Sequence, residues 1–96
     1  MNVNYKIIYR IHAVRRMATR HVEEKDVKEV VEYGEVIETY LDDKPYPSCL
    51  MLGRAGGRPL HVVVAVDEES AEKIFVTVYE PDNDQWFEDL KTRRKA

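Results

Sequence analysis

The stretch LHVVVAV, residues 60–66, is an almost continuous apolar run interrupted by a single histidine. A short run of this kind, rich in β-branched residues, predicts a strand near the centre of a sheet. Before it, the turn residues Ala55-Gly56-Gly57 follow a second β-rich run over 48–54, which predicts a hairpin. After it, the charged residues 67–72 lead to a partner strand over 73–80. The middle of the chain is therefore expected to form an antiparallel sheet.

Toward the N-terminus the hydrophobic period changes to that of a helix. Residues 11–20 and 23–33 each gather apolar side chains on one side when they are plotted at 100° per residue. Gly34 is expected to end the second helix. The side chains expected to face the sheet are Ile11, Val14, Met17 and Ala18 in the first helix, and Val27, Val30 and Val31 in the second.

The remaining segments complete the predicted fold. Residues 5–9 are a short extended entry, and 36–41 is a further strand before the turn residues 42–47. Asp82 or Asp84 is a candidate cap for a short C-terminal helix, whose apolar residues would be Trp86, Phe87 and Leu90. The fold class is therefore α+β: two N-terminal helices on a three- to four-stranded antiparallel sheet, with a short C-terminal helix. The chain is expected to be one domain over 1–96, with a frayed basic tail at 91–96.

Charge alternates in blocks along the 96 residues. The net charge is −3, which argues against indiscriminate binding of polyanions. Residues 1–20 carry five positive charges and no negative one, and residues 44–66 carry three and none. The acidic residues gather in 21–43 and 67–89. A small basic cleft within an acidic shell is therefore compatible with the composition.

Cysteine and histidine usage excludes several classes of site. Cys49 is the only cysteine, so no intrachain disulfide forms and a reducing compartment is expected. His12, His21 and His61 lack the spacing of zinc ligands. Neither a signal peptide nor a membrane-spanning run is present, and a cytoplasmic protein without a cofactor is expected.

The candidate chemistry lies on two neighbouring strands. If Asp67 pairs with Lys73, His61 lies opposite Tyr79, and Ala65 lies beside Phe75. An imidazole and a phenol would then share the sheet face away from the helices, with Arg58 at the mouth of the strand. Such groups can cleave a phosphodiester without a metal, since they supply acid, base and charge stabilisation.

Structural roles remain open for the same residues. His61 can satisfy a neighbour in a half-buried sheet, Tyr79 can simply pack, and Arg58 can be an ordinary turn residue. His12, Arg16 and Arg20 recur every fourth residue along one side of the first helix. That stripe can bind phosphates or pair with the acidic second helix.

Four runs of the sequence resemble a known family. They are HAVRRMATR (12–20), DKPYPSCL (43–50), GRPLHVVVA (57–65) and YEPDNDQW (79–86). The chain is similar, over about residues 5–90, to a small prokaryotic family labelled a domain of unknown function. Its members look like distant relatives of RelE- and MqsR-type toxins, and are commonly encoded beside small zinc-finger antitoxin-like proteins.

The resemblance implies a RelE/barnase-like nuclease scaffold and metal-independent cleavage of RNA. On this hypothesis the protein is the toxin-like ribonuclease of a type II toxin–antitoxin pair. Its catalytic residues would be His61, Tyr79, Arg58 and Arg16, and its substrate-binding residues His12 and Arg20. Expected partners are RNA, a zinc-finger antitoxin-like protein and a second copy of the chain. The alternatives are a non-catalytic protein-interaction module and an RNA-binding protein that does not cleave.

Overall fold

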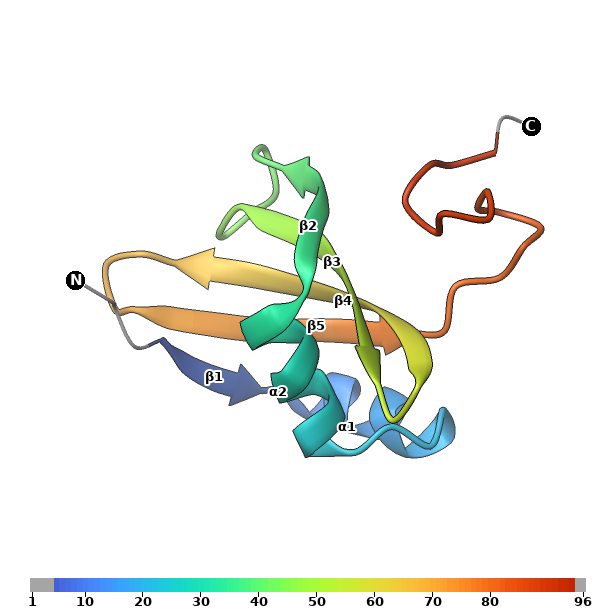
Figure 1. The fold of residues 1–96 in the computed structure, drawn as a ribbon. Helices are drawn as coiled ribbons and strands as arrows, with labels where there is room; N and C mark the ends of the chain where they lie inside the picture. Colours follow the sequence, from blue (N-terminus) through green and yellow to red (C-terminus); the bar gives the residue numbers. More distant parts are fainter. Residues whose placement is uncertain (1–4, 95–96) are drawn as a thin grey trace.

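The computed structural model describes residues 5–94 and contains two helices and five strands within them. The two helices come early, between the first strand and the other four (Figure 1). In chain order the elements are β1 (Lys6–Tyr9), α1 (Ile11–Thr19), α2 (Glu24–Tyr33), β2 (Glu35–Tyr40), β3 (Ser48–Ala55), β4 (Arg58–Asp67) and β5 (Glu72–Tyr79). The expected α+β class, with two N-terminal helices on a sheet, is confirmed.

The sheet has five strands in the order β1-β5-β4-β3-β2, and it is mixed rather than antiparallel. The expected extended entry is a true strand, β1, which pairs in parallel with β5. The prediction of three or four antiparallel strands is therefore wrong at this edge. A strand of only four residues gives little periodic signal, and its pairing depends on a partner more than sixty residues away.

The hydrophobic core lies between the helices and one face of the sheet. Leu60, Val62 and Val64 of β4 project into it, as does Phe75 of β5. The buried residues contributed by the helical region are Ala13, Met17, Val22, Val27, Val30 and Val31. The buried face predicted for α2 is confirmed.

The buried face predicted for α1 is only partly right. Met17 is buried, but Ile11 is 63% exposed and Val14 46% exposed, while Ala13 is buried. Contacts of α1 with the sheet are mainly with β5, and β1 leads directly into α1 from the outer side of that strand. A helix beside the sheet edge buries only a narrow side, so Ile11 and Val14 remain on the surface.

A β-bulge sets the alignment of β4 with β5. The turn pairs Asp67 with Glu72, one residue away from the expected partner Lys73. The register then shifts between Val63 and Val64, which brings His61 opposite Tyr79 as predicted. The expected pairing of Ala65 with Phe75 is wrong, because Ala65 pairs with Ile74 and Phe75 joins the helix-side core.

The hairpin between β3 and β4 turns on two glycines. Gly56 and Gly57 have φ angles of +60° and +79°, and the flanking residues Ala55 and Arg58 are paired. Two positive φ angles in a two-residue loop are typical of a type I′ turn, which suits the twist of the strands. The predicted hairpin is confirmed.

The C-terminal segment, 81–94, contains no helix, so the short helix predicted there is wrong. The segment runs from the end of β5 as a coil and lies apart from the helices (Figure 1). Asp82 accepts backbone N–H bonds from Asp84 and Gln85, and Asp89 accepts them from Lys91 and Thr92. These local turns compete with helix formation.

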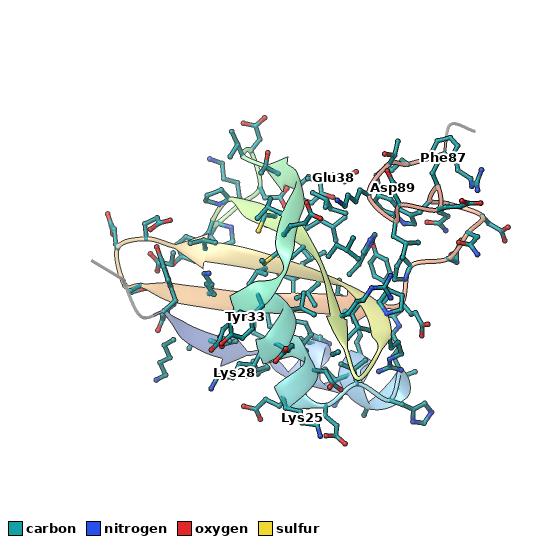
Figure 2. All side chains as sticks on the ribbon, in the orientation of Figure 1. Lys25, Lys28, Tyr33, Glu38, Phe87 and Asp89 are labelled. Atoms are coloured by element: carbon teal, nitrogen blue, oxygen red, sulfur yellow. The ribbon has the colours of Figure 1, made fainter. Side chains whose placement is uncertain are left out.

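The part of the basic tail that the structure describes contacts β2. Lys91 lies 2.7 Å from Glu35, and Arg93 bonds Glu38 through two nitrogens at 2.8 and 3.0 Å. Figure 2 shows Glu38 on β2 and Asp89 on the C-terminal segment at the same corner of the molecule. Residues 95–96 of the predicted tail lie outside the described residues. None of the helices within 5–94 has the length and apolar character needed to cross a membrane.

Candidate functional site

The sheet face away from the helices carries two of the polar residues selected from the sequence, His61 and Tyr79. His61, Val63 and Ala65 of β4 project from it, together with Thr77 and Tyr79 of β5. The C-terminal segment covers one end of this face. The other end lies beside the loop between β2 and β3.

His61 lies at the covered end and has no exposed surface. Its Nε2 is 2.7 Å from the carbonyl oxygen of Leu90, and its Nδ1 is 3.2 Å from the hydroxyl of Tyr79. Because a carbonyl only accepts, Nε2 carries the proton, and the unprotonated Nδ1 accepts the Tyr79 hydroxyl. Trp86 packs edge-on against the imidazole at 4.5 Å between ring centroids. The ring is therefore enclosed, with both nitrogens hydrogen-bonded.

The pKa values of the two side chains are displaced in opposite directions. Burial lowers the pKa of His61, and the hydrogen bond to Leu90 opposes this in part. Burial also raises the pKa of Tyr79, while the positive charge of Arg93 opposes the rise. At neutral pH the pair is therefore a neutral imidazole and an intact phenol, joined by the hydrogen bond from the Tyr79 hydroxyl to Nδ1.

Tyr79 lines a cavity of about 620 Å³ on its other side, which we call the first cavity. Arg20 and Arg58 line it as well, so two arginines and a tyrosine border one space. Its remaining lining residues are Val22, Leu60, Glu80, Asp82 and Gln85. The cavity is thus mixed in charge, and an anion in it would lie on the arginine side.

Backbone contacts hold both arginines in position. Arg20 donates to the carbonyl of Val78 at 2.6 Å, and Arg58 donates to the carbonyl of His21 at 2.9 Å. Neither forms an ion pair with a carboxylate within residues 5–94. A guanidinium has five N–H groups, so each arginine keeps N–H groups that can donate to a phosphate.

His12 lies at a second cavity, of about 340 Å³, toward the other end of α1. Its floor is apolar, and its rim carries Arg10, His12 and Lys44. Arg16 is exposed and lines neither cavity. The spacing of four residues sets it one helical turn from both His12 and Arg20. The stripe predicted from the sequence therefore runs from one cavity to the other.

The structure thus divides the predicted site residues into two groups. Arg58, Tyr79 and Arg20 share the first cavity, and His61 stands behind Tyr79. His12 and Arg16 lie farther along α1. Within residues 5–94 no cluster of three or more His, Cys, Asp or Glu side chains is arranged to hold a metal ion.

Sequence reasoning missed the groups that enclose His61. Trp86 was expected in a helix, and the tail as solvated, yet Arg93 lies 4.6 Å from the Trp86 ring and bonds Glu38. Lys44 and Tyr46 at the second cavity were interpreted as turn residues. The one available signal was the basic character of residues 1–20 and 44–66, which supply Arg10 and Lys44 to the lining of the second cavity.

Comparison with known proteins adds one finding. The family model of a domain of unknown function, DUF4258, matches residues 9–80. The chain belongs to this family. Membership of a family of unknown function, expected from the sequence, is thereby confirmed. No curated protein and no solved structure gives a significant match.

The matched segment of this DUF4258 domain includes most of the site. His12, Arg16, Arg20, Arg58, His61 and Tyr79 all lie between residues 9 and 80. Trp86, Leu90 and Arg93, which enclose His61, lie beyond it. The cavities are therefore built mainly on the DUF4258 core, and the cover of the imidazole comes from residues that follow it.

Proposed function

We propose that the protein is a toxin-like, metal-independent ribonuclease whose reaction takes place in the first cavity. The observation that supports this most directly is that Tyr79 is hydrogen-bonded to the His61 imidazole and lines a cavity that Arg20 and Arg58 also line. A proton acceptor, a phenol and two phosphate-binding groups are the parts that RNA cleavage without a metal requires. A type II toxin–antitoxin pair with a zinc-finger antitoxin-like partner is the setting that the sequence resemblance implies. The single cysteine favours a reducing compartment, which for this function would be the cytoplasm.

The substrate phosphate would bind to the arginine side of the cavity. Arg20 and Arg58 are fixed by backbone carbonyls, so little side-chain entropy is lost when their remaining donors bind an anion. Negative charge grows on the phosphate oxygens in the transition state, where fixed donors are most effective. Arg16, exposed on the same helix, would bind a neighbouring phosphate of the strand rather than the reacting one.

The proton relay would run through Tyr79. The 2′-hydroxyl of RNA gives its proton to the Tyr79 oxygen as the phenolic proton moves to Nδ1 of His61. The 2′-oxygen then bonds to phosphorus, and the bond to the 5′-oxygen breaks. The 5′-oxygen takes a proton from water, and the hydroxide so formed takes back, through Tyr79, the proton that His61 received. The products are a 2′,3′-cyclic phosphate and a 5′-hydroxyl. His61 is a positioning residue in this scheme, since it is buried and reaches the substrate only through Tyr79.

The direct experiment is cleavage of labelled RNA by the purified protein in EDTA. We expect Tyr79→Phe to reduce the rate by about 10²-fold or more, the range of general acid–base catalysis. Arg20→Gln and Arg58→Gln should reduce it too. Arg54→Gln is the matched control, since Arg54 is an exposed arginine in the same hairpin. Equal rates for wild type, Tyr79→Phe and Arg54→Gln would refute the assignment.

A protein-interaction module is the second candidate, and the exposed apolar side chains favour it. Ile11 and Val14 are solvent-exposed on α1, and Tyr33 of α2 is 77% exposed. Ile11 and Val14 lie within one turn of each other on α1, and neighbouring exposed apolar residues are typical of an interface. Growth arrest on expression that Tyr79→Phe abolishes would favour the nuclease. Tight association with a protein, without arrest or RNA cleavage, would favour the module.

A further inference from the structure

The second cavity has the composition of a small-molecule site rather than of a packing defect. Its volume of about 340 Å³ lies within the range of ligand pockets. The floor is formed by side chains of two neighbouring strands, Val63 and Ala65 of β4 with Ile74 and Val76 of β5. Pro45 and Tyr46, from the loop between β2 and β3, form one wall. A flat apolar ring would find apolar contacts on two sides.

The rim of the cavity is cationic. Arg10 and Lys44 reach it from different segments of the chain, and His12 lies beside them on α1. Neither Arg10 nor Lys44 pairs with a carboxylate in the part of the chain that the structure describes. Asp43 also lines the cavity, and its carboxylate accepts a hydrogen bond from the Ser48 hydroxyl while keeping its negative charge. Two cations without a carboxylate partner thus outnumber one carboxylate around an apolar floor.

We infer that the second cavity binds one nucleoside monophosphate unit of an RNA strand. The base would lie on the apolar floor against Tyr46, since a base can stack on an aromatic ring. Its phosphate would bind Arg10 and Lys44. An inorganic anion would use only the rim, and an apolar molecule only the floor. A nucleotide uses both.

The position of the cavity relative to the first one supports the same ligand. His12 on α1 and Arg20, the residue directly after α1, are eight residues apart, about 12 Å at 1.5 Å per residue. Arg16 stands between them on the same side of the helix. A strand of a few nucleotides could therefore lie along α1, with its base in the second cavity and another phosphate at Arg20 and Arg58. The inference rests on the proposed function for the identity of the polymer, but not for binding itself.

The test is a titration of the ¹⁵N-labelled protein, followed by NMR, with each of the four ribonucleoside monophosphates. Ribose 5-phosphate and the free nucleosides are the comparison ligands. We expect nucleotides to shift the signals of Ala65, Ile74 and Tyr46, and to bind at least fivefold more tightly than either comparison ligand. Lys44→Ala and Arg10→Ala should each weaken binding severalfold. Lys28→Ala, which removes a lysine on α2 (Figure 2), should not.

Several outcomes would overturn the inference. Equal affinity for ribose 5-phosphate and nucleotides would show an anion site without a base pocket. Signal shifts confined to Arg20, Arg58 and Tyr79 would place the nucleotide in the first cavity, and no shifts at all would mean no site. Ala65→Phe provides an independent check, because it fills the cavity: a folded variant that still binds nucleotides equally well contradicts the inference.

The result is separable from the proposed ribonuclease activity. Nucleotide binding at the second cavity, together with RNA cleavage that Tyr79→Phe does not slow, would leave the inference standing and refute the catalytic assignment. RNA cleavage that depends on Tyr79 but is unaffected by Lys44→Ala and Ala65→Phe would support the catalytic assignment and contradict the inference.

Discussion

His61 and Tyr79 face each other across the ladder between β4 and β5, with Nδ1 of the imidazole 3.2 Å from the phenolic oxygen. This pairing depends on a β-bulge in β5: Val63 pairs with Thr77 and Val64 with Phe75, so Val76 has no partner on β4. The bulge compensates for the turn before β5, which is one residue out of the expected register. Leu90 fixes the tautomer from the other side of the ring. The buried pair therefore links the central strands to the C-terminal segment.

Burial of the neutral His61 should make stability depend on pH. Its pKa in the folded protein is lowered from the ordinary value of 6.5. As pH falls below about 6.5, the unfolded chain takes up a proton that the folded chain does not, so the folded state loses stability. We expect the free energy of unfolding to decrease between pH 7 and pH 5, as measured by urea denaturation. The decrease should be smaller in His61→Gln, and parallel curves for both proteins would contradict this account.

Trp86 should contribute strongly to stability although it lies in a segment without helix or strand. It is 1% exposed and packs on His61 and Arg93. Trp86→Ala should reduce the free energy of unfolding by about 3–5 kcal/mol, as large-to-small changes in a core do. Phe87→Ala is the matched control, because Phe87 is the next residue and its aromatic ring is 44% exposed at the periphery (Figure 2). Phe87→Ala should reduce the free energy of unfolding by less than about 1 kcal/mol. Similar reductions for Trp86→Ala and Phe87→Ala would show that the segment is not docked on the sheet.

The sequence was most informative where a local pattern decides the structure. Strand β4, the glycine turn and α2 each carry their signal within about ten residues, through an apolar run, positive-φ residues and a periodic face. The pairing of His61 with Tyr79 was also predicted, although the bulge that produces it was not. A bulge adds one residue to one strand, and no spacing in the sequence identifies which residue it will be.

The errors concern contacts between distant segments. Parallel addition of β1 to β5 joins residues more than sixty positions apart, and it moves α1 to the sheet edge, where Ile11 and Val14 are exposed. The coil over 81–94 is held by Trp86 on His61 and by Arg93 on Glu38. These contacts depend on the assembled sheet, so a local pattern of a capping aspartate and apolar residues gave the wrong prediction of a helix.

The ion pair between Arg93 and Glu38 should couple the C-terminal segment to β2 measurably. Arg93 donates through two nitrogens and keeps the pKa of Glu38 below its usual range, with Tyr40 also donating to the carboxylate. A double-mutant cycle with Arg93→Gln and Glu38→Gln should give a coupling energy of up to about 1 kcal/mol. Because Arg93 is half-exposed, the value should decrease in 1 M salt. The more exposed pair Lys91 and Glu35 should give a smaller value, and a larger one there would contradict this ranking.

Gly34, between α2 and β2, should resist substitution for a steric reason. Its φ angle of −76° suits any residue, but a Cβ there would lie 2.5 Å from the carbonyl oxygen of Val30 and 2.7 Å from that of Leu52. Neither carbonyl can move without displacing α2 or β3. Gly34→Ala should therefore cost about 1–3 kcal/mol, as overpacking does.

Gly56 separates this steric effect from backbone strain. A Cβ at Gly56 meets nothing within 4 Å, but its φ of +60° is costly for alanine, by about 1–2 kcal/mol. The distinguishing measurement is amide hydrogen exchange in the two variants. Gly34→Ala should accelerate exchange at the junction of α2 with β3, and Gly56→Ala only in the hairpin between β3 and β4. Unchanged protection of Val30 and Leu52 in Gly34→Ala would show that the close contact is not what requires glycine there.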